Sequence, residues 1–171
     1  VVVVHLDPTH KSFMPDLLGR ATTLAVEHAM DRQTLEADHV YVIPPDRQLT
    51  LDQGVIRLHE PVDRRALRGT IDRFFRSLAE DQRGRAVGIV LSGTGTEGAL
   101  GLRAIKAEGG LLMAQSPETA SQPGMPASAI ATGLVDFVLP PDEMPAVLAR
   151  YARNVAQSGL TAPEDPSAAA R

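Results

Sequence analysis

An apolar run that leads directly into a glycine-rich loop is the feature that most constrains how this chain can fold. Residues 86–91 form the run, and Gly93, Gly95 and Gly98 lie in the loop that follows. A short, continuous apolar run is typical of a strand buried on both faces, and such strands belong mainly to parallel sheets covered by helices. Ligands of such proteins bind at the carboxyl edge of the sheet. The loop therefore marks the edge where a functional site is expected.

Strands and helices are expected to alternate along the rest of the chain. Strands are predicted at residues 1–4, 26–30, 39–43, 111–115 and 135–139, helices at 12–23, 71–79, 99–108, 126–132 and 142–158, and a hairpin at 48–58. This pattern predicts an α/β fold with a doubly wound, mainly parallel sheet, a Rossmann-like three-layer arrangement and one antiparallel hairpin insertion. One domain is predicted over residues 1–158, followed by a linker or disordered tail at 159–171.

Apolar stripes on the expected helices should face the core. The helix at 71–79 has the strongest pattern, with apolar side chains at Ile71, Phe74, Phe75, Leu78 and Ala79. The helix at 12–23, which Ser12 is expected to cap, has a second stripe formed by Phe13, Leu17, Ala21 and Leu24.

Composition excludes several classes of protein. The chain has 171 residues, 43% of them hydrophobic, a net charge of -4 and no cysteine. The lack of cysteine removes disulfides, thiolate catalysis and zinc–thiolate sites. No basic cluster is present, so nucleic acid is not expected as a partner. No apolar run approaches the roughly 18 residues of a membrane span, so no membrane insertion is expected. The expected location is the cytoplasm.

The sequence begins with four valines, a pattern typical of the interior of a strand. A natural chain begins with Met and rarely starts within a buried strand. We therefore expect that residues upstream of Val1 are missing and that the sequence is a fragment or a domain of a longer protein.

The loop glycines also match a dinucleotide-binding pattern. Gly93, Gly95 and Gly98 have the Gly-x-Gly-x-x-Gly spacing between a predicted strand and a predicted helix. That site needs an acid about 20 residues further on to bind the ribose. The next strand ends without one, and Glu97 would place a negative charge beside the phosphates. Dinucleotide binding is therefore kept as a lesser alternative.

His5 and Glu97 are the two side chains most suited to chemistry. Each follows a predicted parallel strand, so both belong to the same edge of the sheet. A histidine oriented by a carboxylate is the base half of a nucleophilic triad, and N–H groups of a glycine loop can stabilise an oxyanion. Ser12, Ser77 and Ser92 are candidate nucleophiles by residue type, but each has a structural interpretation.

A metal site is the alternative for His5. His5, Asp7 and His10 have metal-binding side chains at close spacing. No matching cluster occurs elsewhere in the sequence, so no metal site is predicted.

Several motifs, taken in order, resemble the catalytic domain of the chemotaxis protein-glutamate methylesterases. The resemblance spans residues 1 to about 151, and its motifs lie at 2–6, 39–45, 91–99, 124–126 and 133–139. The stretch 5–12 is particularly similar to versions fused to a receptor methyltransferase and sensor modules. The resemblance therefore implies a chemotaxis receptor as partner, with a fused methyltransferase or regulatory domain as a neighbour.

The resemblance also implies roles for individual residues. His5 matches the triad histidine, Glu97 stands where the family has aspartate, and the backbone N–H of Thr94 corresponds to an oxyanion donor. The family's serine segment, together with a central strand, would lie before Val1. This chain alone is therefore expected to be inactive.

The implied reaction is hydrolysis of glutamate methyl esters on methyl-accepting chemotaxis receptors, with glutamine deamidation as a companion reaction and no cofactor or metal. The change from aspartate to Glu97 leaves open a second possibility, a non-catalytic domain that binds a receptor or regulates its neighbours.

Overall fold

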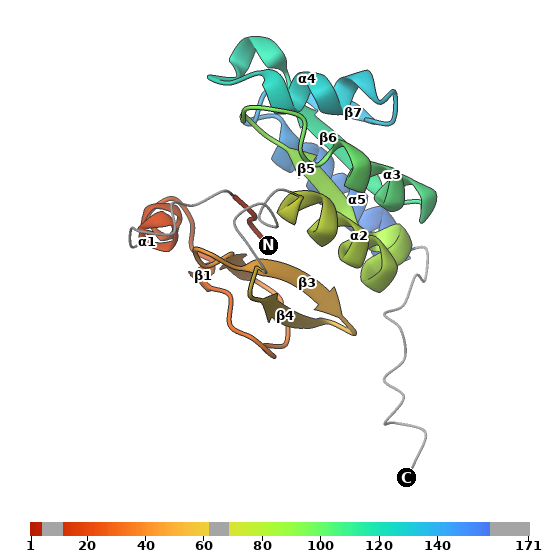
Figure 1. Ribbon diagram of the computed structural model, residues 1–171. Helices are drawn as coiled ribbons and strands as arrows, with labels where there is room; N and C mark the ends of the chain where they lie inside the picture. Colours follow the sequence, from red (N-terminus) through yellow and green to blue (C-terminus); the bar gives the residue numbers. More distant parts are fainter. Residues whose placement is uncertain (5–11, 62–68, 158–171) are drawn as a thin grey trace.

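The computed structural model describes residues 1–4, 12–61 and 69–157, and Figure 1 shows the arrangement of its elements. Its helices are α1 (Met14–Gly19), α2 (Thr70–Gln82), α3 (Ala99–Ala107), α4 (Gly124–Ala131) and α5 (Met144–Gln157), with short 3-10 turns at Arg83–Arg85 and Pro117–Thr119. Its strands are β1 (Ala25–His28), β2 (His39–Val42), β3 (Gln48–Asp52), β4 (Val55–His59), β5 (Val87–Val90), β6 (Leu111–Gln115) and β7 (Phe137–Leu139).

The strands form three small sheets, which confirm the predicted mixture of parallel pairing and one hairpin. β5, β6 and β7 are parallel, with β6 in the centre. β1 and β2 are also parallel, and Val2 forms a single parallel bridge to Val42 on the other side of β2. β3 and β4 form the antiparallel hairpin, in which Gly54 adopts a φ of +74°.

Helices cover both faces of the β5–β6–β7 sheet, which gives three layers. Alternate residues of β6 point to opposite faces because successive strand side chains alternate. Leu112 and Ala114 belong to the main core, together with Leu102 and Ile105 of α3. Leu111 and Met113 face the other way and form a second cluster with residues of α5, including Met144. This observation confirms the predicted α/β class.

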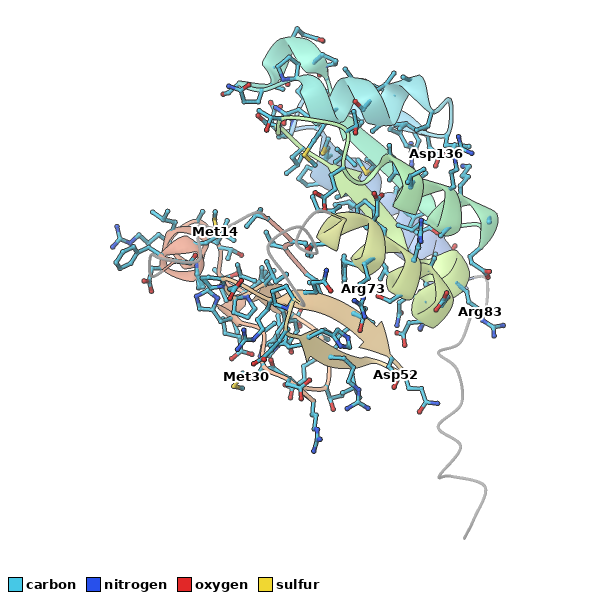
Figure 2. All side chains as sticks on the ribbon, viewed as in Figure 1. Met14, Met30, Asp52, Arg73, Arg83 and Asp136 are labelled. Atoms are coloured by element: carbon cyan, nitrogen blue, oxygen red, sulfur yellow. The ribbon has the colours of Figure 1, made fainter. Side chains whose placement is uncertain are left out.

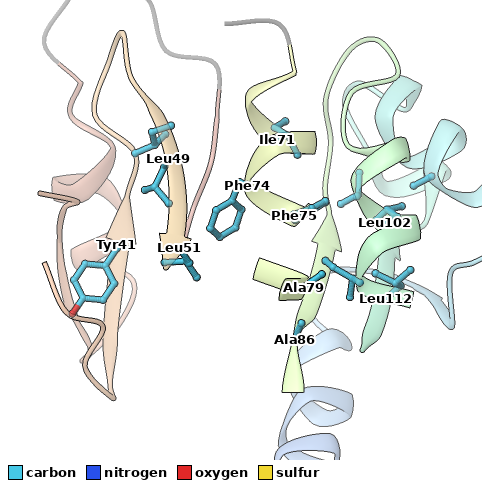
Figure 3. Packing of buried hydrophobic residues seen from close by; sticks show 14 of the residues in the cluster. Tyr41, Leu49, Leu51, Ile71, Phe74, Phe75, Ala79, Ala86, Leu102 and Leu112 are labelled. Carbon is cyan, nitrogen blue, oxygen red and sulfur yellow. The ribbon is translucent and has the colours of Figure 1, made fainter. Parts of the chain in front are cut away.

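Helix α2 lies between the β3–β4 hairpin and the β5–α3 unit (Figure 3). Phe74 extends toward Leu51 of the hairpin, and Phe75 lies on the side of α3. Both rings are buried, and they belong to a single cluster that continues from Leu49 to Leu102. Burying an aromatic side chain of this size contributes on the order of 2 kcal/mol. One amphipathic helix therefore joins two sheets that share no strand.

Hydrogen bonds fix the hairpin against α2. Leu51 N–H donates to Ser77 Oγ at 3.0 Å, and Gly54 N–H donates to Asp81 Oδ1 at 2.9 Å. Arg73, which Figure 2 shows between the hairpin and α2, donates from Nη1 to Gln48 Oε1 at 2.7 Å. The predicted 71–79 helix thus has a polar side that is also used in packing.

The first predicted helix is shorter and more exposed than expected. It begins at Met14 and ends at Gly19, and Ser12 Oγ accepts the Met14 N–H at 3.2 Å. Phe13 and Leu17 are each 60% exposed, so the predicted buried stripe is wrong. A stripe over residues 13–24 needs about three helical turns. Six helical residues bring only part of it to one face.

Residues 1–4 and β5 also differ from the prediction that both are fully buried strands. Val2 makes only one bridge, and Val87 and Ile89 of β5 are half-buried. Val1, Tyr41, Val87 and Ile89 line a cavity of about 430 Å³ between the two parallel sheets. In the described part of the chain, β6 is instead the strand with all five residues buried.

Among the residues that the structure describes, no helix is both long and apolar enough to cross a bilayer.

Gly101 tests how closely α2 and α3 pack. A Cβ there would lie 2.6 Å from Phe75 Cβ and 3.0 Å from Asp72 O. We expect Gly101→Ala to lower the free energy of unfolding by about 1–3 kcal/mol, as overpacking does. Alanine at an unobstructed helix position would instead raise it by up to about 1 kcal/mol. Urea unfolding measures the sign, and exposed Arg103→Ala, expected within about 0.5 kcal/mol of the parent, is the control.

His59 should make the stability of the fold depend on pH. Burial lowers the pKa of His59, and the nearby Arg73 guanidinium lowers it further, against a smaller opposing effect of Asp31. The unfolded chain therefore binds a proton near pH 6.5 more readily than the folded chain, and stability is lost as the pH falls through that value. We expect His59→Gln to reduce the loss of unfolding free energy between pH 7.5 and 5.5 in urea titrations. Equal losses in both proteins would contradict this assignment.

Candidate active site

The glycine loop, residues 91–98, connects the carboxyl end of β5 to α3. Gly95 and Gly98 have φ of +85° and +94°, in the left-handed region that favours glycine. Gly93 lies close to α4, and a Cβ there would lie 2.4 Å from Met125 Sδ and displace that side chain. The motif glycines are thus explained by backbone conformation and close approach.

A turn at the start of α4 holds the loop in place. Gly93 donates its N–H to Gln122 O at 2.9 Å and accepts the Met125 N–H on its own carbonyl at 2.8 Å. The backbone N–H of the adjacent, exposed Thr94 donates to no acceptor in the described part of the chain. Thr94 therefore presents an open donor on a fixed backbone, as an oxyanion site requires.

The buried side-chain amide of Gln115 binds the backbone of the glycine loop. Gln115, the last residue of β6, is 6% exposed, and its Oε1 accepts the Ser92 N–H at 2.8 Å. Its Nε2 donates to Thr119 O at 3.0 Å. A fully bonded buried amide of this kind gives the loop a defined position relative to β6.

Glu97 lies at the end of the loop and is half-buried. Its Oε1 accepts the backbone N–H of Ile71 at 2.8 Å, at the second residue of α2. Carboxylates are stabilised at helix N-termini by unpaired N–H groups and the helix dipole. The acid expected to orient a histidine is therefore anchored to α2.

The candidate serines all have structural hydrogen bonds. Ser77 Oγ donates to Phe74 O at 2.9 Å and accepts the Leu51 N–H. Ser92 Oγ accepts the Gln122 N–H at 3.0 Å. Ser12 Oγ accepts the Met14 N–H, although the N-cap residue of α1 is Phe13 and not Ser12 as predicted.

His5 lies outside the described residues, as do Asp7 and His10, so its pairing with Glu97 stays a prediction. Within residues 1–4, 12–61 and 69–157, no group of three potential ligand side chains could hold a metal ion.

The geometry does not favour the dinucleotide alternative. A pyrophosphate would bind the first N–H groups of α3. Gly101 N–H, in that first turn, already donates to Asp72 Oδ1 at 2.7 Å. Glu97 adds a second carboxylate near the same helix terminus.

Sequence reasoning missed three supports of the site: the α2 N-terminus with Asp72, the Gln122–Met125 turn, and Gln115. A polar residue ending a buried strand is a signal that could have identified Gln115. No local pattern predicts that α2 and the glycine loop meet, because they are far apart in the sequence.

Comparison with known proteins now assigns the family. Residues 1–148 match the family model described as CheB methylesterase. The catalytic domain of the Thermotoga maritima CheB methylesterase has a similar structure, with a TM-score of 0.78, 28% identity and coverage of 87% of this chain and 81% of that one.

One of two similar curated proteins is named as a methylesterase, and the other is uncharacterised. The chain is 36% identical over 159 residues to a Myxococcus xanthus protein-glutamate methylesterase/protein-glutamine glutaminase, covering 90% of the chain and 46% of the relative. It is 43% identical over 157 residues to an uncharacterised 104.1 kDa protein of Rhodobacter capsulatus, covering 91% of the chain and 16% of that protein. The chain thus spans less than half the length of these relatives. Because the family model covers residues 1–148 of the 171 in the sequence, this chain belongs to the CheB methylesterase family.

Proposed function

We propose that this chain is the part of a protein-glutamate methylesterase catalytic domain that carries His5 and Glu97, and that the complete domain acts on glutamate methyl esters of chemotaxis receptors. The position of Glu97 is the observation that carries the proposal. Glu97 is an anchored carboxylate on a glycine loop at the carboxyl end of β5, three residues after the open N–H of Thr94. The family match supports the same reaction.

The proposed reaction follows triad chemistry. A serine attacks the ester carbonyl while His5 takes its proton, and His5 then gives that proton to the departing methoxide, which leaves as methanol. Glu97 holds the His5 tautomer and stabilises its charged form, and the Thr94 N–H stabilises the oxyanion. Water then attacks the acyl-enzyme with His5 as base, which regenerates the serine and leaves free glutamate. An amide in place of the ester would give glutamine deamidation, with ammonia as the leaving group.

The proposed nucleophile is a serine supplied from outside these 171 residues. Two observations support this proposal. Ser12, Ser77 and Ser92 make structural hydrogen bonds, and the outer edge of β5 borders the 430 Å³ cavity without a strand partner among the described residues. An additional parallel strand paired with β5 would end beside the glycine loop. The fused methyltransferase implied by residues 5–12 stays a prediction.

A non-catalytic, receptor-binding or regulatory domain is the second candidate. The bond from Ile71 N–H to Glu97 favours it, because that bond gives the glutamate a structural role independent of catalysis. The two candidates differ in the response to Glu97→Asp. A gain of esterase activity in an otherwise inert full-length protein would favour the non-catalytic domain.

Glu97→Gln tests the proposed role of the carboxylate. The amide oxygen can still accept the Ile71 N–H, so the fold should be retained, but it favours the wrong histidine tautomer. We expect methanol release by the full-length protein from a methylated receptor to fall about 10²- to 10⁴-fold, in line with the effect of the equivalent change in other triads. Exposed Glu118→Gln is the matched control and should keep parental activity. Unchanged activity in Glu97→Gln would refute the catalytic proposal.

His5→Gln tests the base. We expect a loss of at least about 10³-fold in the same assay, because the serine then has no proton acceptor. His59→Gln, in β4 and outside the proposed site, should retain activity at pH 7.5 and controls for nonspecific damage. A His5 variant that releases methanol at the parental rate would exclude His5 as the base.

A further inference from the structure

The N-termini of α2 and α3 are joined by two hydrogen bonds that run in opposite directions. Ile71 N–H, in the first turn of α2, donates to Glu97 Oε1 at 2.8 Å. Gly101 N–H, in the first turn of α3, donates to Asp72 Oδ1 at 2.7 Å. The first turn of α3 is therefore bonded to a carboxylate of α2, and the first turn of α2 is bonded to a carboxylate of the loop that precedes α3.

The packing around this pair leaves little freedom. A Cβ at Gly101 would lie 3.0 Å from Asp72 O, and one at Gly98 would lie 3.2 Å from Ile71 Cγ2. The two first turns are thus in close contact, and the two bonds determine how they sit against each other. Glu97 lies two residues before the start of α3, so a displacement of that first turn displaces Glu97 as well.

We propose that Asp72 is a positioning residue for the Glu97 carboxylate, acting through the reciprocal capping of α2 and α3. This inference rests on the proposed function, in which Glu97 orients His5. Asp72 fixes the start of α3 and lies next to Ile71, whose N–H holds the carboxylate itself. Loss of Asp72 would therefore free the α3 end of the segment that carries Glu97 and loosen the α2 turn that holds its carboxylate.

The proposal also gives a reason for glutamate at position 97. A carboxylate on a longer arm reaches across the loop to the α2 N-terminus, where an aspartate would stop about 1.5 Å short. The additional methylene group gives the side chain one more rotatable bond, and the hydrogen bond to the α2 N-terminus restrains it. Such anchoring matters because a misplacement of about 1 Å can cost about 10²-fold in rate.

Asp81, on the same helix, is the control that distinguishes a positioning role of Asp72 from a purely structural one. Asp81, at the other end of α2, accepts the Gly54 N–H at 2.9 Å, which is also a carboxylate bond to the backbone of another element. Gly54 belongs to the hairpin turn, which is outside the glycine loop. Asp72→Ala and Asp81→Ala remove the same kind of bond, but only the first affects Glu97.

The experiment measures methanol release by the full-length protein from a peptide that carries a glutamate γ-methyl ester, as a function of pH. We expect Asp72→Ala to lower kcat about 10- to 100-fold with KM within about twofold of the parent. The acidic limb of the kcat/KM profile should move to lower pH, because a histidine that loses its carboxylate partner releases its proton more easily. Asp72→Asn, which keeps an oxygen acceptor for Gly101 N–H, should recover most of the activity.

Asp81→Ala should lower the urea midpoint without moving the acidic limb. Identical pH profiles for Asp72→Ala and Asp81→Ala would overturn the proposal. If Asp72→Ala does not fold, Asp72→Glu provides the test, since it keeps the charge but lengthens the arm that sets the position of α3. A shift of its acidic limb is expected, and an unchanged limb would overturn the inference. Full activity of Glu97→Gln would instead show that the proposed function itself fails, and this inference with it.

Discussion

The burial of α2 on two sides is the interaction on which the rest of this structure depends. Phe74 packs toward the hairpin and Phe75 toward α3, and both belong to one continuous apolar cluster. The sheets on either side share no strand in the described part of the chain. The apolar contacts of α2 therefore hold the two sheets together, as strand pairing would in a continuous sheet. Because these contacts are non-directional, polar bonds such as Arg73 to Gln48 must fix the orientation.

The same helix connects the core to the candidate site. Its first turn receives Glu97 and provides Asp72, so the glycine loop is held by α2 on one side. The Gln122–Met125 turn holds Gly93 on the other side, and Gln115 supports Ser92. A loop restrained in this way can present an N–H group and a carboxylate without rearrangement, which is how preorganised sites stabilise developing charge.

Prediction from sequence succeeded where a local pattern determines the structure. The alternation in the hairpin and the run at residues 111–115 were correctly predicted because strand periodicity and turn chemistry act within a few residues. It failed at residues 12–23, where the helix ends at Gly19 and leaves Phe13 and Leu17 exposed. It also overestimated the burial of Val87 and Ile89, because the cavity beside β5 depends on which elements flank it.

The sequence by itself determined the α/β class, the glycine loop and the identity of Glu97 as its one acid, because these follow from local periodicity and composition. Only the tertiary structure decided that the Glu97 carboxylate binds the Ile71 N–H, that Asp72 caps α3, and that Thr94 keeps an open N–H. The two hydrogen bonds join residues that are 26 and 29 positions apart. Their partners are selected by the packing of α2 against α3, which no local pattern encodes.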